Sequence, residues 1–207
     1  MNLSRHIFPY LFPKYTWKRI TDQKVVYLTF DDGPIPDITE WVLHLLEKYN
    51  IKATFFCIGD NVRKHPEVFR QIVAHKHRIG NHTFNHLNGW KNEKITYEEN
   101  ILLANEEMTK HTILPKLLFR PPYGKIKQNQ GKELLKRGYE IIMWSHISKD
   151  YDKNISSEEC YQNAISAIQP GSIIVFHDSI KAEKNMKYAL PKTIEYLIEE
   201  GYSFGIL

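Results

Sequence analysis

The chain has 207 residues, of which 42% are hydrophobic and 25% are charged, and its formal net charge at pH 7 is +4. This length and composition are ordinary for a soluble globular protein with one large core, and no stretch is apolar enough over a sufficient length to span a bilayer. The mild basic excess would suit an acidic polymer such as a cell-wall glycan or nucleic acid, but the Lys and Arg residues are scattered, which favours a solvated surface over a dedicated basic patch.

The N-terminal residues differ from the rest of the chain. Pro9 and Pro13 interrupt a stretch that lacks a sustained apolar region and a small-residue cleavage site, so we predict no signal peptide. The compartment stays open, with the cytoplasm or a membrane periphery as the default. We expect residues 1–22 to pack on one main domain of residues 23–207, although the aromatic-rich residues 7–17 would alternatively suit contact with a membrane surface.

Short apolar segments alternate with longer amphipathic ones along the main domain. The predicted strands are residues 25–30, 53–58, a short one near 78–80, 117–119, 140–144, 172–176 and 203–207. The predicted helices are residues 38–49, 66–75, 97–111, 130–136, 157–168 and 188–200. Thr96 with Glu99, and Ser156 with Glu159, fit the capping box that begins a helix.

This alternation predicts an α/β fold of parallel β-α units. About seven such units in one domain favour a distorted (β/α) barrel over an open sheet. In such folds the residues just past the C-terminal ends of the strands converge on one face. The polar residues that follow predicted strands are Asp31, Asp32, His82, Arg120, His146, Asp150 and His177.

Two motifs indicate a metal site. Thr-Phe-Asp-Asp-Gly-Pro at residues 29–34 ends a strand on Asp31 and Asp32, and His-Thr-Phe-Asn-His places His82 and His86 four positions apart. One carboxylate and two imidazoles form the three-ligand site that catalytic zinc uses to activate water, and the second carboxylate is a natural general base.

Each motif also has a plainer interpretation. Asp-Gly is a strong turn signal, but a turn alone would leave two adjacent carboxylates repelling each other at a buried strand end. His82 and His86 are a weak signal by themselves among ten histidines. On one helical turn, however, they would face the same side and bind one ion.

Two further motifs supply candidate catalytic groups. Pro121 and Pro122 stiffen the loop after Arg120, so that the amide of Tyr123 is fixed in a direction suited to an oxyanion, and Arg120 can pair with a carboxylate. The alternative is a rigid loop with a surface arginine.

His177 ends a strand, and Asp150 is available to orient its ring. A lone histidine in this position is usually structural. Trp90 follows His86 in a loop, where it can stack on a sugar ring or cover the core. We assign substrate contact to Trp90, Pro122 and Tyr123.

From about Lys24 to the C-terminus, these motifs together resemble the polysaccharide deacetylases, the NodB-homology group of carbohydrate esterase family 4. The resemblance implies a base at Asp31 and metal ligands at Asp32, His82 and His86. It also implies a distorted barrel, and Zn²⁺ or a similar divalent ion such as Co²⁺, Ni²⁺ or Mn²⁺.

The later motifs of that family fall on Arg120, Pro122 and Tyr123, and on Val175 with His177. One motif departs from the family pattern. Its Asp-x-x-Asp-Trp falls on residues 147–151, where Ile147 replaces the first Asp and Tyr151 the Trp, whereas Asp150 is kept. The departure bears on substrate preference and pocket shape more than on the metal site.

We therefore expect a metal-dependent hydrolase that removes acetyl groups from an acetylated carbohydrate. The substrate would be an N-acetylglucosamine glycan such as peptidoglycan or a chitin-like oligomer, or an O-acetylated polysaccharide. Its partner would be this oligo- or polysaccharide rather than nucleic acid, and we expect a monomer. The alternatives are a carbohydrate-binding protein with weak or no catalysis, and a small-molecule amidase that uses the same metal site.

Overall fold

The computed structural model of the chain describes residues 9–207. Seven strands form one parallel sheet in the order β5-β4-β3-β2-β1-β7-β6, and β8 pairs with β1 beside it. The strands are β1 Val25–Asp31, β2 Thr54–Cys57, β3 Arg78–Asn81, β4 Leu118–Phe119, β5 Glu140–Ile141, β6 His146–Ile147, β7 Ile173–His177 and β8 Ser203–Phe204. The sheet curls into a half-barrel, which confirms the predicted fold class.

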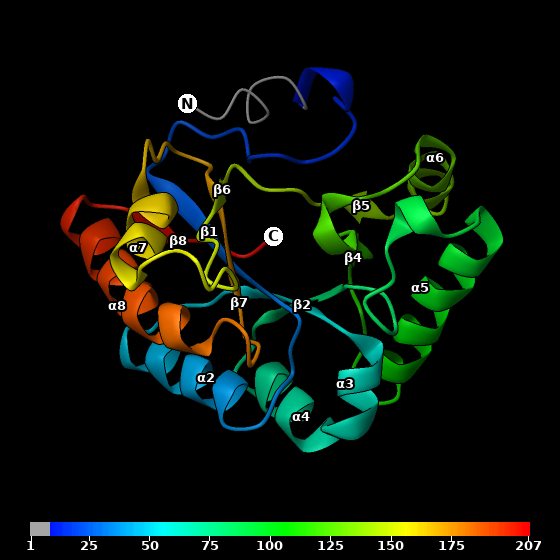
Figure 1. The fold of residues 1–207 in the computed structure, drawn as a ribbon, viewed down its shortest axis with the longest axis horizontal. Coiled ribbons are helices and arrows are strands. Elements are labelled where there is room, and N and C mark those ends of the chain that lie inside the picture. Colours follow the sequence, from blue (N-terminus) through cyan, green and yellow to red (C-terminus); the bar gives the residue numbers. More distant parts are fainter. Residues whose placement is uncertain (1–8) are drawn as a thin grey trace.

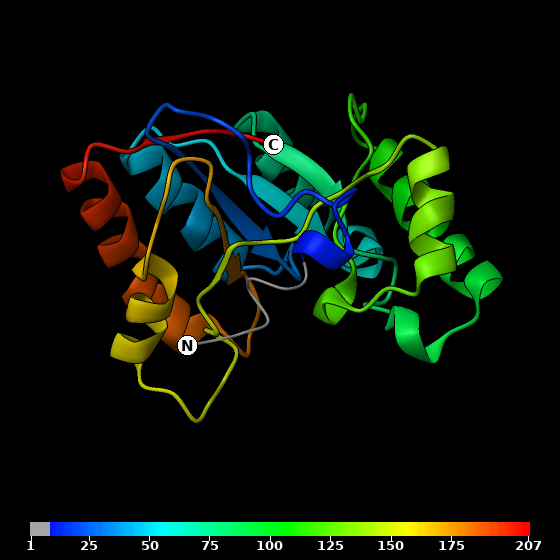
Figure 2. The same cartoon turned by 90° about the horizontal axis from the view of Figure 1, so that it is seen from above.

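Helices surround the outer side of this curled sheet, as Figures 1 and 2 show. They are α2 Ile38–Lys48, α3 Gly59–Lys64, α4 Pro66–Ala74, α5 Lys94–Thr109, α6 Gln128–Lys136, α7 Ser157–Ile165 and α8 Glu183–Glu199, with short 3₁₀ helices η1 Gly89–Lys91 and η2 Pro122–Gly124. The capping box predicted at Ser156 is confirmed, since its Oγ accepts the amide of Glu159 at 3.1 Å. The box at Thr96 is wrong, because α5 begins at Lys94 and Glu93 occupies the N-cap position.

The sheet remains open between β5 and β6, although these two strands are neighbours in the sequence. The N-terminal segment crosses the sheet at this side: Thr16 bridges to Ile142 and Lys18 bridges to Ser172. The amide of Thr16 donates to the carbonyl of Ile141, and the amide of Met143 donates to the carbonyl of Thr16, both at 2.8 Å. Residues 1–8 of the predicted segment lie outside the described residues, and its boundary at residue 22 stays a prediction.

A large apolar core fixes the strands that carry the site. The rings of Phe30 and Phe55 stack with centroids 4.9 Å apart, and Phe176 of β7 adjoins Phe30 at 6.5 Å. All three side chains are buried between the sheet and the helices packed on it. Because the core reaches the last residues of β1, β2 and β7, the side chains just beyond them start from a rigid base.

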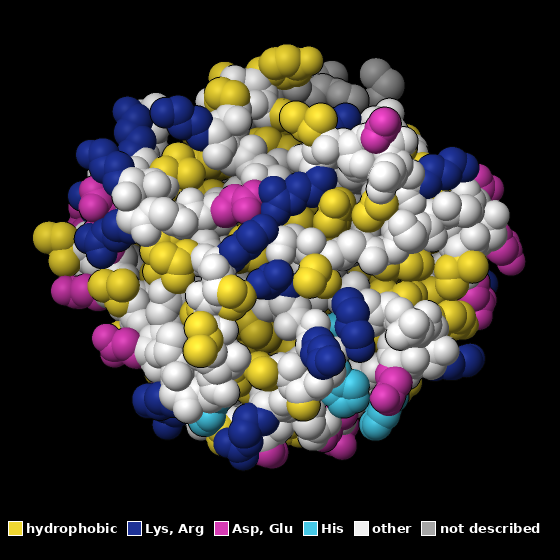
Figure 3. Space-filling model, turned by 180° about the vertical axis from the view of Figure 1, so that it is seen from behind, with side chains coloured by type: hydrophobic (Ala, Val, Ile, Leu, Met, Phe, Trp, Pro, Cys, Tyr) yellow, Lys and Arg dark blue, Asp and Glu magenta, His cyan; other side chains and the backbone are white. Residues whose placement is uncertain are grey.

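The surface carries mixed charge. Figure 3 shows the face behind the view of Figure 1, where Lys and Arg side chains are spread among acidic and apolar ones. Among residues 9–207, none of the helices has both the length and the apolar character needed to cross a membrane.

Candidate active site

The polar residues that follow the strands meet at one end of the half-barrel. Asp31, the last residue of β1, lies opposite His177, the last residue of β7, in the strand register. Asp32 follows directly, and His82 follows β3. The geometry of parallel strands therefore brings together residues that are far apart in the sequence.

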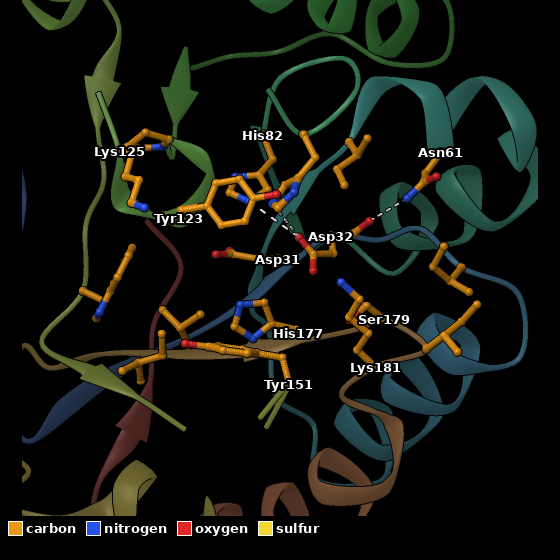
Figure 4. A pocket seen from close by; sticks show the side chains of 18 residues that line it. Asp31, Asp32, Asn61, His82, Tyr123, Lys125, Tyr151, His177, Ser179 and Lys181 are labelled. Carbon is orange, nitrogen blue, oxygen red and sulfur yellow. Dashed lines mark hydrogen bonds and ion pairs between the residues drawn. The ribbon is translucent and has the colours of Figure 1, made fainter. Parts of the chain in front are cut away.

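Three of these side chains form a candidate metal centre. Ligand atoms of Asp32, His82 and His86 all lie within 4.8 Å of one another. Asp32 Oδ1 is 3.3 Å from His86 Nε2 and 3.7 Å from His82 Nε2. Figure 4 shows the carboxylate of Asp32 turned towards the ring of His82.

The proton arrangement at this cluster fits a divalent cation. His82 Nδ1 lies 2.7 Å from the carbonyl oxygen of Arg120, which can only accept, so Nδ1 carries the proton and Nε2 presents a lone pair to Asp32. Asp32 Oδ1 is buried and has no hydrogen-bond partner among residues 9–207. Two lone-pair donors facing one another without a proton between them need a cation, and Asp-His-His is a donor set that suits zinc.

Both imidazoles are held in the neutral form that binds metal. Burial lowers the pKa of His82. Burial, with the neighbouring His82, lowers the pKa of His86 to about 4. Neutral rings at physiological pH leave their ring nitrogens available as ligands.

The expected helical turn over His82 and His86 is wrong. The two residues lie in an irregular loop after β3, in which Thr83 and His86 adopt left-handed backbone conformations with φ of 64° and 58°. The side chain of Asn81 accepts the amide of Thr83 at 2.8 Å, and Thr83 Oγ1 accepts the amide of Leu87 at 2.8 Å. Side-chain hydrogen bonds thus shape the loop, where the sequence spacing suggested a helix.

A second loop holds Asp32, and two residues that the sequence analysis missed anchor it. Asn61 Nδ2 donates to the carbonyl of Asp32 at 2.7 Å, and Asp178 Oδ1 accepts the amide of Gly33 at 3.1 Å. A Cβ atom at Gly33 would lie only 1.9 Å from Asp178 Oδ2, so this approach requires glycine. The sequence did contain a signal for Asp178, because this residue directly follows His177 at the end of β7.

Asp31 is paired with a fully buried arginine. Arg120 Nη1 donates to Asp31 Oδ1 at 2.7 Å and to Thr29 Oγ1 at 2.7 Å, and Nη2 donates to the carbonyl of Met143 at 3.0 Å. Burial is the largest single influence and raises the pKa of Asp31, but the charge and hydrogen bond of Arg120, with the charges of His82 and His177, together outweigh burial and hold the pKa below its ordinary value. Because Arg120 is 0% exposed, the interpretation as a surface arginine is wrong.

His177 is oriented by Asp150. Nδ1 of His177 lies 2.7 Å from Asp150 Oδ1, and the backbone amide of His177 donates to Asp150 Oδ2 at 2.7 Å. Burial alone would lower the pKa of His177, but the charge and hydrogen bond of Asp150, with smaller contributions from Asp32 and Asp31, raise it to about 9. The imidazole is therefore protonated at neutral pH, with its other nitrogen available to donate.

A cleft of about 590 Å³ is lined by Asp31, His177 and the three candidate metal ligands. Figure 4 shows Tyr123 and Lys125 on one side of it and Ser179 and Lys181 on the other. Tyr151 meets the ring of His177 edge-on at 4.9 Å. The other described residues that line the cleft are Ile35, Ile58, Asn61, Pro121, Trp144, Ile147, Val175 and Ile180.

Of the three residues assigned to substrate contact, Tyr123 lines the cleft and the other two do not. Tyr123 is 60% exposed, and its ring lies 4.5 Å from that of His86. Trp90 and Pro122 are not among the described residues that line the cleft. Trp90 lies just beyond it, with the ammonium of Lys125 5.3 Å from its ring. The roles of all three residues in substrate binding stay predictions.

The curled parallel sheet and the polar groups at its strand ends define a (β/α) half-barrel hydrolase. A family model described as polysaccharide deacetylase matches residues 18–142. The chain is 34% identical over 192 residues to a peptidoglycan-N-acetylglucosamine deacetylase of Bacillus cereus, covering 91% of this chain and 89% of the relative. It is 33% identical over 162 residues to a chitooligosaccharide deacetylase of Bradyrhizobium, covering 77% and 73%.

A solved structure agrees with these matches. That of the Bc1960 peptidoglycan N-acetylglucosamine deacetylase has a TM-score of 0.90 at 32% identity and covers 97% of this chain and 94% of its own. The chain therefore belongs to the polysaccharide deacetylase family of carbohydrate esterases, and it is a hydrolase that removes acetyl groups from an acetylated carbohydrate.

Proposed function

We propose that this chain removes the acetyl group from N-acetylglucosamine residues of peptidoglycan with the help of one Zn²⁺ ion bound by Asp32, His82 and His86. The observation that carries the proposal is the arrangement of Asp32 Oδ1, which lacks a hydrogen-bond partner within residues 9–207 and faces two neutral imidazoles. The base candidate Asp31 adjoins it in the sequence and in the cleft.

A divalent ion in this centre would supply Lewis acidity, which polarises the acetyl carbonyl and lowers the pKa of water. The chain supplies the proton transfers. Asp31 would accept a proton from the attacking water, because Arg120 keeps its carboxylate ionised and fixes its position. Asp31 is only 3% exposed, so bulk water competes little for this carboxylate.

The charge that develops on the acetyl oxygen needs a hydrogen-bond donor. The backbone amide of Tyr123 is the candidate, since Pro121 and Pro122 stiffen the preceding loop and Tyr123 has an unusual φ of 61°. His177 would then protonate the departing amine, because Asp150 holds its imidazole in the protonated form. In this assignment the two proton-transfer groups, Asp31 and His177, occupy paired positions at the ends of the neighbouring strands β1 and β7.

The choice of peptidoglycan rests on the relatives. The Bacillus cereus relative is named a peptidoglycan-N-acetylglucosamine deacetylase, and a Bacillus subtilis relative, 30% identical over 187 residues, is named a peptidoglycan-N-acetylmuramic acid deacetylase. The chitooligosaccharide deacetylase of Bradyrhizobium is the competing precedent. In this chain the exposed rings of Trp90 and Tyr123 would contact the sugar rings, and the buried Pro122 would hold Tyr123 in place.

An acetate-release assay tests the proposal. Purified protein, with its metal content measured in the same preparation, is incubated with peptidoglycan fragments, chitooligosaccharides and O-acetylated xylan. We expect the highest kcat/KM on peptidoglycan fragments, with acetate lost from N-acetylglucosamine. A higher value on xylan would refute the choice of substrate, and binding of every glycan without acetate release would refute the assigned chemistry.

A further inference from the structure

Two lysine side chains line the cleft from opposite sides. Lys125 follows η2, and Lys181 lies in the loop between β7 and α8. Figure 4 shows Lys125 beside Tyr123, and Lys181 beside Ser179 on the far side of Asp32. The cleft therefore carries a positive charge on each of these two sides.

Neither lysine is neutralised within the described part of the chain, since no acidic side chain pairs with Lys125 or Lys181. Some surface lysines outside the cleft do have such partners: Lys110 lies 2.6 Å from Glu107, and Lys187 lies 2.7 Å from Glu183. The two cleft lysines thus keep their charge available for a ligand.

The carboxylates inside the cleft do not compensate for this charge. Of the described residues that line it, Asp31 and Asp32 are the acidic ones. Asp31 is paired with Arg120 at 2.7 Å, and Asp32 faces the two histidines of the candidate metal centre. A neutral acetylated sugar would leave both lysines without a counter-charge.

The side chain of Lys125 also contacts one aromatic ring, that of Trp90. Its ammonium lies 5.3 Å from the ring centre of Trp90, and the indole N–H of Trp90 donates to the carbonyl of Ile126 at 3.2 Å. Tyr123 lies two residues earlier in the same segment and is largely exposed. An aromatic surface next to a cation suits a sugar ring that carries an acidic substituent.

We propose that Lys125 and Lys181 form a divided anion subsite, in which each lysine, on its own side of the cleft, binds the lactyl carboxylate of a peptide-free muramic acid residue next to the N-acetylglucosamine that is deacetylated. This inference rests on the proposed function and deepens it, because it makes the preference for an acidic glycan over a neutral one a property of two named side chains. Cations at the rim act chiefly on specificity and on capture of the substrate.

Matched substrates test the subsite. Peptide-free peptidoglycan oligosaccharides are prepared with free muramic carboxylates and as their methyl esters, and kcat/KM for acetate release is measured on both. We expect wild-type protein to prefer the free acid about tenfold at low salt, and this preference to fall as salt is added. In the double variant Lys125→Met/Lys181→Met the ratio of kcat/KM on the free acid to kcat/KM on the ester should fall to about one.

Two further variants separate charge from side-chain identity and position. Lys125→Arg/Lys181→Arg should keep the preference for the free acid, because it keeps both positive charges. Lys127→Met is the matched control: Lys127 lies two residues from Lys125 but pairs with Glu93 at 3.5 Å and does not line the cleft, so the ratio should stay at the wild-type value. A double methionine variant that still prefers the free acid tenfold, or a wild type with no preference, would overturn the proposal.

Equilibrium binding separates this inference from the proposed function. The fully de-N-acetylated acid and ester oligosaccharides bind without turnover, and we expect the acid to bind wild-type protein about tenfold more tightly at low salt. Tighter binding of the acid with no acetate release from any glycan would refute the function but support the subsite. Acetate release from acid and ester at equal rates, with equal binding, would refute the subsite alone.

Discussion

Replacing Asp150 with asparagine tests the assignment of His177 as the general acid. An asparagine Oδ1 can still accept a hydrogen bond from His177 Nδ1, whereas its NH₂ group cannot accept the backbone amide of His177; the substitution therefore removes the negative charge and one hydrogen bond. Burial lowers the pKa of His177 and the Asp150 carboxylate raises it, with a net value of about 9 against an ordinary 6.5. Without the carboxylate, burial remains, and the pKa should fall to 6.5 or below.

The size of the effect follows from these two values. With a pKa of about 9, roughly nine-tenths of His177 is protonated at a pH of about 8, whereas with a pKa of 6.5 only about 3% is protonated. Acetate release by Asp150→Asn should therefore be about 30-fold lower than wild type at a pH of about 8. The loss should shrink as the pH is lowered, and the alkaline limb of the kcat profile should move from about 9 to 6.5 or lower.

Stability supplies a second readout. The pKa of His177 is raised in the folded state, so its contribution to stability is complete below pH 6.5 and is lost as the pH rises to about 9. That contribution amounts to about 3 kcal/mol of unfolding free energy below pH 6.5. The difference in urea unfolding between wild type and Asp150→Asn should be largest at acidic to neutral pH and should shrink as the pH rises to about 9 and above.

The control is Asp152→Asn, which removes a neighbouring carboxylate whose Oδ1 accepts the amide of Asn154 and which does not touch His177. Its pH profile should match that of wild type. An unshifted alkaline limb in Asp150→Asn would refute the reasoning, because the carboxylate would then not set the protonation of the group that limits turnover.

Two other substitutions test Asp31 as the base and its ion pair with Arg120. Asp31→Asn should keep the bound metal, measured by elemental analysis, but lower kcat for acetate release by about 10²–10⁴-fold, and retained turnover would remove Asp31 from the role of base. Arg120→Met leaves the Asp31 carboxylate buried without its partner, so the unfolding free energy should fall by about 3–5 kcal/mol and the acid limb of the pH profile should move to higher pH. An unchanged urea midpoint and acid limb would contradict the account of a buried ion pair.

The sequence was most informative where a chemically reactive side chain directly follows a recognisable strand. The apolar run of β1 ending on Asp31 and Asp32 predicted both a strand and the residues at its end, and the strands before His82 and His177 did the same. Parallel strands put such residues at one edge whatever the details of the loops. The arrangement of the sheet and the proximity of Asp32 to two histidines could therefore be anticipated without coordinates.

Other parts depend on contacts that the sequence does not reveal. The loop over His82–His86 takes its shape from Asn81, whose side chain accepts the amide of Thr83, so spacing alone suggested a helical turn that does not exist. α3 has six residues and β6 has two, which is too short for periodicity to identify them. The cleft lysines escaped notice because an unpaired surface lysine is recognisable only once its neighbours are known.

The measurement that tests the account most directly is acetate release during removal and return of the metal. Protein stripped with a chelator and shown by elemental analysis to be metal-free should release no acetate from peptidoglycan fragments. Addition of one equivalent of Zn²⁺ should restore activity in wild-type protein but not in His82→Ala/His86→Ala. Full acetate release by the metal-free protein would contradict the central claim that Asp32, His82 and His86 hold the ion on which the reaction depends.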